Sequence, residues 1–156
     1  MFMCLGVKTT YMKLTTFLFG LLFIISSCNK HSEKSIYQDY QGRWNLTKMS
    51  GNTANSETTG SDMEWQESYV FNSNGTFLKS REQNGNLTES SGSFTVTKSE
   101  EGNILELTHV SDSNIIGSCL GNKKEVLVLQ SKVVLSSTWN QCDGPGLEYE
   151  KAMNID

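Results

Sequence analysis

The feature that most constrains the fold of this chain is a series of short runs rich in aromatic and β-branched residues. They recur at intervals of roughly ten residues, separated by turns of asparagine, glycine, serine and charged residues, a pattern typical of antiparallel strands. We count eight or nine of these strands, over residues 42–49, 63–71, 77–81, 87–97, 104–110, 115–120, 125–130, 133–139 and 147–151. No long helical pattern interrupts them, so the sequence predicts an all-β fold.

Short turns connect several of these strands. Residues 72–75, Asn-Ser-Asn-Gly, predict a hairpin in which Gly75 supplies a positive φ, and residues 83–86, Gln-Asn-Gly-Asn, predict another. A longer polar loop is expected over 50–62. A meander joined by hairpins exposes two edge strands unless it closes on itself. We therefore predict an antiparallel meander of eight to nine strands closed into a barrel, with a two-sheet β-sandwich as the alternative.

The beginning of the chain has the pattern of an export leader. Lys13 precedes an apolar run, residues 14–25, which is too short to span a bilayer core of roughly 30 Å. The run ends in Ile25-Ser26-Ser27-Cys28, which resembles the lipobox of bacterial lipoproteins. The resemblance implies that residues 1–27 are a signal peptide and that Cys28 is lipidated, which would attach the protein to a membrane.

Two parts follow the leader. Residues 28–36, the lipidated cysteine and a polar stretch without apolar periodicity, are expected to form a tether. Residues 37–156 are expected to form the barrel domain, and apolar residues at helical spacing over 36–40 predict a short helical turn at its start. Asn29 is not an acidic retention signal. The expected location is therefore the cell envelope, with the lipid anchor in the outer membrane.

Charge limits the classes of partner. Loss of Lys8 and Lys13 with the leader changes the formal net charge from −4 to −6. Such an acidic surface repels nucleic acids and anionic headgroups, so we expect no nucleic-acid partner.

The cysteines predict one disulfide. Cys4 is lost with the leader and Cys28 is acylated, which leaves Cys119 and Cys142 as the remaining thiols in an oxidising compartment. A bridge between them would stabilise the fold by about 3 kcal/mol by constraining the unfolded chain. A metal pair or a catalytic thiol is the rival interpretation, but the domain contains one histidine, His109, and no Cys-x-x-Cys.

Few residues carry recognisable chemistry. His109 alternates with leucines and is interpreted as a barrel histidine with satisfied hydrogen bonds rather than a base. The carboxylates Asp62, Glu64 and Glu67 lack the spacing of a calcium loop and predict a solvated acidic rim. Residues 117–121, Gly-Ser-Cys-Leu-Gly, lack the following helix and downstream histidine of a nucleophile elbow. We expect no enzymatic activity, no cofactor and no metal site.

A family resemblance rests on several of these motifs together. Gly42-Arg43-Trp44 at the first strand is similar to the Gly-x-Trp signature of lipocalins. The leader, the early hairpin over 69–77, and Cys142-Asp143-Gly144 shortly before the final Tyr149-Glu150-Lys151 extend the likeness. Over residues 40–153 the chain resembles the small lipocalin-like lipoproteins of Gram-negative bacteria.

The resemblance carries expectations about the barrel. In lipocalins the tryptophan plugs the closed end of an eight-stranded barrel, which would be the place of Trp44. Lipocalins usually also place an arginine near the end of the chain that stacks on this tryptophan. Here the nearest candidate is Lys151, which lacks the planar guanidinium. The domain is also shorter than a typical lipocalin, and bulky inward residues would fill it.

Two functions from different classes remain open. The first is a lipid-anchored module that holds a small apolar or amphipathic molecule, with six aromatic residues as candidate lining: Trp44, Trp65, Tyr69, Phe71, Phe77 and Phe94. The second is a non-catalytic structural or protein-interaction module with a filled barrel, whose loops over 50–62 and 111–114 face a partner. Aromatic residues suit a filled core as well as a pocket. An open interior cavity of roughly 300 Å³ or more would favour the first.

Overall fold

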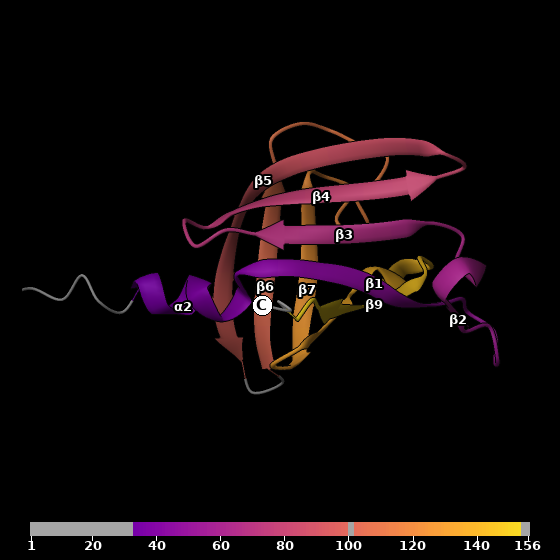
Figure 1. The fold of residues 1–156 in the computed structure, drawn as a ribbon, viewed down its shortest axis with the longest axis horizontal. Helices are drawn as coiled ribbons and strands as arrows, with labels where there is room; N and C mark the ends of the chain where they lie inside the picture. Colours follow the sequence, from indigo (N-terminus) through magenta and orange to yellow (C-terminus); the bar gives the residue numbers. More distant parts are fainter. Residues whose placement is uncertain (1–32, 100–101, 154–156) are drawn as a thin grey trace, which may run out of the picture. The chain divides into compact units, whose positions relative to one another are not determined.

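The strands wrap around a single interior, with a short helix at one end (Figure 1). The structure is a computed structural model and describes residues 33–99 and 102–153. Its elements are α2 (Glu33–Tyr40), β1 (Gly42–Ser50), β2 (Thr58–Thr59), the 3-10 turn η1 (Gly60–Asp62), β3 (Gln66–Phe71), β4 (Thr76–Gln83), β5 (Asn86–Ser99), β6 (Gly102–His109), β7 (Lys124–Ser131), β8 (Val134–Ser137), the 3-10 turn η2 (Trp139–Cys142) and β9 (Gly146–Lys151). No helix within these ranges is long and apolar enough to cross a bilayer.

Pairing between the first and last strands closes the barrel. Neighbours along the order β1-β3-β4-β5-β6-β7-β8-β9 pair antiparallel, and β1 pairs with β9 from Trp44 opposite Lys151 to Ser50 opposite Gly146. The two-residue strand β2 is added beside the end of β1. The prediction of an all-β antiparallel barrel is therefore confirmed, with eight strands in the closed barrel and one extra strand. The two-sheet sandwich is ruled out.

The hairpin turns form where the glycines allow them. Gly75 and Gly85 adopt φ angles of 81° and 76°, in the left-handed region that glycine enters without steric cost. The Asn72 N–H donates to the carbonyl of Thr76 at 2.9 Å, which fixes the turn between β3 and β4. Both turns lie at the predicted positions.

Several predicted elements differ from the structure. The strand expected over 63–71 begins only at Gln66. Residues 115–120 form no strand, because the backbone of this stretch bonds to charged side chains of the barrel interior instead of to a neighbouring strand. The strand expected over 133–139 ends at Ser137, and Trp139 begins η2. The helix begins at Glu33, within the stretch expected to be a tether. The predicted signal peptide and Cys28 lie outside the described residues.

The barrel end next to α2 is sealed by apolar side chains. Trp44 is fully buried, and its indole Nε1 donates to the Tyr40 carbonyl at 2.8 Å. The Tyr37 ring meets the Phe94 ring edge-on with centroids 5.1 Å apart. The Lys151 Nζ lies over the Trp44 ring, 5.5 Å from its centroid. These contacts bury Trp44 at the end of the barrel next to α2.

Candidate functional site

A cluster of charged side chains fills the other half of the barrel interior. Because side chains alternate across a strand, Glu67 shares the inward face of β3 with Tyr69, and Lys79 and Arg81 share the inward face of β4 with Phe77. On β7 the inward face carries Glu125. All four charged side chains are buried. Glu67 is therefore not part of the predicted solvated rim, although Asp62 and Glu64 are exposed as expected.

The four charges neutralise one another. The Lys79 Nζ lies 2.6 Å from Glu125 Oε1 and 3.2 Å from Glu67 Oε1. The Arg81 Nε lies 2.5 Å from Glu67 Oε2. Burying an unpaired charge is strongly unfavourable, whereas a pair with good geometry and further hydrogen bonds is tolerated. We refer to Glu67, Lys79, Arg81 and Glu125 as the ion cluster.

Three hydrogen-bond donors outside the ion cluster also bond to Glu125. It accepts hydrogen bonds from the Tyr69 hydroxyl at 3.0 Å, from His109 Nε2 at 2.9 Å and from the backbone N–H of Gly117. Burial alone raises the pKa of Glu125. Attraction to Lys79 and the hydrogen bonds from His109, Lys79 and Gly117 outweigh burial and lower its pKa to about 2. Glu125 is thus held as a carboxylate.

Two tyrosines and the histidine act as donors to the cluster. Burial and the neighbouring carboxylates, mainly Glu125 for Tyr69 and Glu67 for Tyr149, raise the pKa values of both tyrosines well above their usual value. The Tyr149 hydroxyl donates to Glu67 at 2.6 Å. His109 Nδ1 lies 2.7 Å from the Ser90 hydroxyl, so both ring nitrogens have partners. The interpretation of His109 as a satisfied barrel histidine is confirmed.

The segment over residues 110–123 covers this end of the barrel. Ile115 is buried, and its carbonyl accepts from Arg81 Nη2 at 3.3 Å. The guanidinium also lies over the Trp65 ring, with Cζ 4.1 Å from its centroid, while the Trp65 Nε1 has no hydrogen-bond partner among the described residues. The ion cluster is therefore paired and buried beneath this segment.

The six aromatic side chains predicted to line a pocket are all buried in the hydrophobic core. Each is at most 7% exposed. The Phe71 and Phe94 rings meet edge-on at 4.9 Å, and the Tyr69 and Phe71 rings stack at 5.6 Å. Phe77 packs against Phe71 at 6.3 Å. All six belong to one hydrophobic core cluster, with Trp44 at the α2 end and Trp65 beside Arg81 at the end with the ion cluster.

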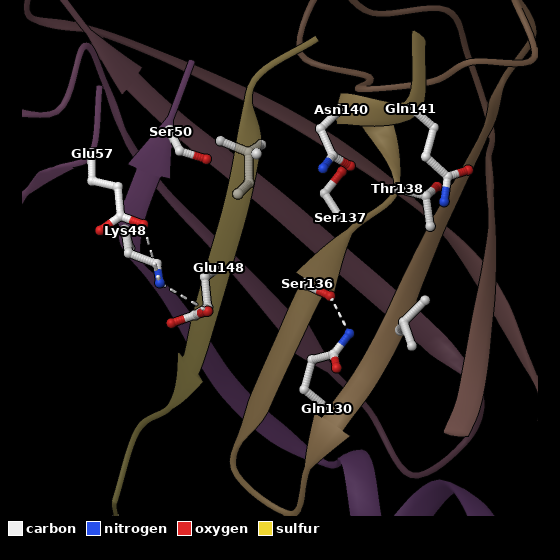
Figure 2. Close-up of a pocket in the computed structure, with 13 residues that line it drawn as sticks. Lys48, Ser50, Glu57, Gln130, Ser136, Ser137, Thr138, Asn140, Gln141 and Glu148 are labelled. Carbon is white, nitrogen blue, oxygen red and sulfur yellow. Dashed lines mark hydrogen bonds and ion pairs between the residues drawn. The ribbon is translucent and has the colours of Figure 1, made fainter. Parts of the chain in front are cut away.

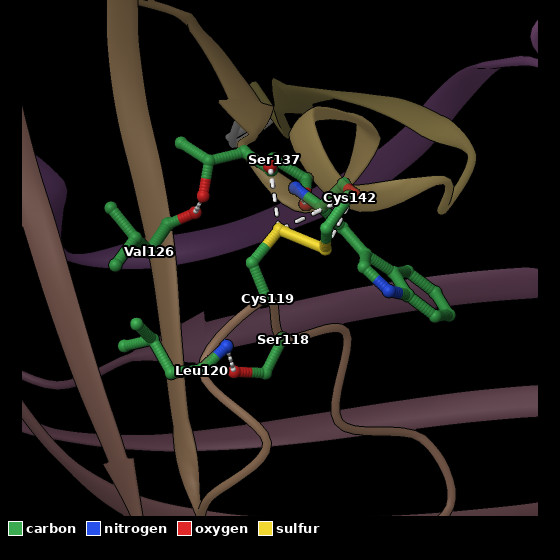
Figure 3. Close-up of a disulfide and its surroundings, with 8 residues drawn as sticks. Ser118, Cys119, Leu120, Val126, Ser137 and Cys142 are labelled. Atoms are coloured by element: carbon green, nitrogen blue, oxygen red, sulfur yellow. Dashed lines mark hydrogen bonds between the residues drawn. A yellow bond between two sulfur atoms is a disulfide. The ribbon is translucent and has the colours of Figure 1, made fainter.

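The predicted disulfide joins the covering segment to η2 (Figure 3). Cys119 and Cys142 are bonded, with Cα atoms 5.5 Å apart, and both residues are exposed. Beside the bridge, the Trp139 ring packs against Gly117 and Gly144. A Cβ added at either glycine would lie within 2.6 Å of the ring, so only glycine allows this contact. The bridge and the tryptophan together fix η2 against the barrel.

A concave surface lies on the outer wall of the barrel, across β1, β9, β8 and β7 (Figure 2). Its volume is about 340 Å³. We call it the polar groove. It is lined by Lys48, Ser50, Glu57, Val128, Gln130, Ser136, Ser137, Thr138, Asn140, Gln141, Gly146, Leu147 and Glu148. None of the six aromatic residues predicted as pocket lining belongs to it.

The side chains of the polar groove differ in how far they are already paired. Lys48 Nζ lies 3.3 Å from Glu148 and 4.0 Å from Glu57. The Gln130 amide donates to the Ser136 hydroxyl at 2.7 Å. The carboxamides of Asn140 and Gln141, on η2, are exposed and form no hydrogen bond within the described residues. These two amides are therefore free to bind a ligand.

The surface has other hollows. One, of about 360 Å³, lies on the outer faces of β1, β3, β4 and β5 and includes Arg43 and Glu89. Another, of about 610 Å³, lies beside α2 and includes Asp39, Asn103 and Lys132. Within the described residues, no group of three or more histidine, cysteine and carboxylate side chains is placed to hold a metal ion.

Comparison with known proteins gives no relative for this chain. No family model, no curated protein and no solved structure matches it. Inference about function therefore depends on the residues of the chain itself.

The sequence analysis missed both the ion cluster and the polar groove. The ion cluster had a signal, because Glu67 shares the alternating phase of Trp65 and Tyr69, whereas the groove is assembled from separate elements and had none.

Proposed function

We propose that this protein is a lipid-anchored protein of the bacterial cell envelope whose barrel is a non-catalytic interaction module. The observation that carries the proposal is the filled interior. Packed aromatic rings occupy one half and a neutralised ion cluster the other. A protein with such an interior binds through its outer surface, where the polar groove offers unpaired amides.

The anchor is supported by the lipobox-like sequence that ends at Cys28. Acyl chains contribute about 0.8 kcal/mol for each CH₂ buried in the bilayer, so several chains hold a protein to the membrane lastingly. The exposed disulfide agrees with an oxidising compartment outside the cytoplasm. Asn29 after the lipidated cysteine favours the outer membrane.

Binding of a small apolar or amphipathic molecule inside the barrel stays a prediction. To admit it, the rings of Tyr69, Phe71, Phe77 and Phe94 would have to separate. Close-packed interiors resist such opening, because the ligand would have to restore the dispersion attraction that the separated rings give up. The filled-barrel function requires no such rearrangement, and for that reason we place it first.

Fractionation of cells that express the full chain tests the anchor. With Cys28→Ser we expect loss of lipid labelling and release from salt-washed membranes, whereas Cys4→Ser, the matched control within the leader, should leave both unchanged.

Native mass spectrometry of the protein from its own host tests the filled interior. We expect the mass of the lipidated chain alone, and a stoichiometric small apolar molecule would contradict the filled barrel.

A further inference from the structure

We propose that the polar groove binds a neutral oligosaccharide. This inference deepens the proposed function, on which it rests for the choice of the outer surface as the binding surface. Two walls face each other across the groove: Lys48 and Glu148 on one side, and the η2 amides of Asn140 and Gln141 on the other (Figure 2). The chemistry of these walls excludes several other classes of ligand.

Charge excludes ionic ligands. Among the described lining residues, Lys48 is the one cation, and it lies between two carboxylates, Glu57 and Glu148. An anion such as a phosphate or a nucleic acid would meet no free cation and would be repelled by the carboxylates. A cationic ligand would have to displace Lys48 from both. The groove therefore favours an uncharged ligand.

The lining also lacks the features that bind apolar ligands and most peptides. Its apolar side chains are Val128 and Leu147, and no aromatic residue lines it among the residues that the structure describes. Small-molecule pockets for apolar compounds are lined mainly by apolar and aromatic groups. Peptide interfaces usually depend on buried aromatic or arginine anchors. An uncharged molecule that carries many hydroxyl groups fits this lining better than either.

The free hydrogen-bonding groups match such a molecule. Each carboxamide, on Asn140 and on Gln141, offers two N–H donors and an acceptor oxygen. The Ser50 hydroxyl adds a group that both donates and accepts, and the Ser136 hydroxyl, which accepts from Gln130, can still donate. Sugar hydroxyls also donate and accept, so one ring can bond to both kinds of group. The volume of about 340 Å³ lies at the lower end for small-molecule sites and suits a short oligosaccharide.

The wall that carries the amides is held in place before any ligand arrives. The bridge from Cys142 to Cys119 and the packing of Trp139 on Gly117 and Gly144 fix η2. A site fixed in advance loses less conformational freedom on binding. This rigidity matters most for ligands whose affinity comes from a few hydrogen bonds.

Calorimetric titration and saturation-transfer NMR test the proposal on the purified full chain in a detergent without a sugar headgroup. The probes are N,N′,N″-triacetylchitotriose and cellotriose, which has the same linkage without acetamido groups. We expect at least one to bind. Asn140→Ala combined with Gln141→Ala should weaken it about tenfold or more, because two hydrogen bonds are lost. Gln38→Ala, an exposed amide on α2 outside the groove, is the matched control and should change nothing.

The dependence of the affinity on salt concentration distinguishes a neutral ligand from an ionic one. We expect the affinity to be the same at low and high salt, because no charge is neutralised on binding. Absence of binding by both probes at about 10 mM, far above the millimolar dissociation constants expected of a few hydrogen bonds, would overturn the proposal. Binding that is unchanged in the double variant or falls steeply with salt would also overturn it. The Cys28→Ser fractionation does not involve the groove, so the two proposals fail independently.

Discussion

The two halves of the barrel interior are filled by side chains of opposite chemistry. Next to α2, the space is filled by Trp44, Phe71, Phe94 and their apolar neighbours, and stability there depends on shape and volume. Beneath the 110–123 segment, the space is filled by the ion cluster, and stability depends on each charge keeping its partner. An apolar core accepts a substitution of similar volume, whereas a paired core does not accept the loss of one charge.

The largest expected effect comes from two conservative changes on the same strand. Glu125→Gln keeps the shape of the side chain but removes the charge that faces Lys79. We expect it to lower the free energy of unfolding by about 3–5 kcal/mol, since it breaks a buried pair. Leu127→Met, which is also inward-facing on β7, should cost less than about 1.5 kcal/mol. Urea unfolding of both variants measures the difference, and equal costs would show that the two halves do not differ.

Opening the disulfide should affect one half more than the other. The two cysteines are 23 residues apart, so replacing both by serine should cost about 3 kcal/mol through the entropy of the unfolded chain. Hydrogen exchange should quicken at Gly117 and its neighbours, and change less at Trp44. The wild-type chain under reducing conditions is the control and should show the same loss of stability and the same exchange pattern as the variant with both cysteines replaced. Uniform acceleration across the barrel would contradict a role of the bridge confined to one end.

Acid should destabilise the ion cluster. Glu125 has a pKa of about 2 in the fold against a usual value of 4.5. A depressed pKa stabilises the fold above the unfolded value, and this contribution is lost as pH falls through the folded value. We expect a loss of about 2–3 kcal/mol between about pH 5 and pH 2. Urea unfolding as a function of pH measures it. Glu125→Gln should flatten this part of the profile, and an unchanged slope would assign the acid sensitivity elsewhere.

The smallest effect compares the two buried tryptophans. Trp44→Phe leaves the Tyr40 carbonyl without its donor and should cost about 2 kcal/mol. Trp65→Phe removes an N–H that has no partner among the described residues, so relief of an unsatisfied group offsets lost packing and the cost should stay below about 1 kcal/mol. Thermal unfolding of the two variants provides the comparison. A larger cost at Trp65 would mean that its stacking on Arg81 dominates.

The fold could be predicted from the sequence because its signals are local. Alternation along each strand and turns such as Asn72–Gly75 each depend on a few adjacent residues. The short strand expected over 115–120 was wrong because tertiary contacts take over its backbone, with Ile115 and Gly117 bonding to Arg81 and Glu125. Local patterns contain no information about such distant partners.

The ion cluster was missed for a related reason. Charged residues on strands are usually solvated, so Glu67 was assigned to the surface although its phase matches Tyr69. Which charges are buried depends on their partners, and the partners of Glu67 come from β4 and β9. The polar groove depends even more on tertiary structure, because its walls meet only after β1, β9, β8 and η2 are in place.

Pairing of β1 with β9 has a consequence for how the chain folds. The strand that begins the barrel finds its last neighbour only in residues 146–151, so residues paired between the two strands lie about 96 to 107 positions apart in the chain. Topologies dominated by such distant contacts fold slowly, on a scale of about milliseconds to seconds. Until β9 docks, β1 presents an open edge that can pair with another chain. A chain truncated before Gly146 should therefore self-associate. In the full chain, docking of β9 covers the edge of β1 and so removes this site of aggregation.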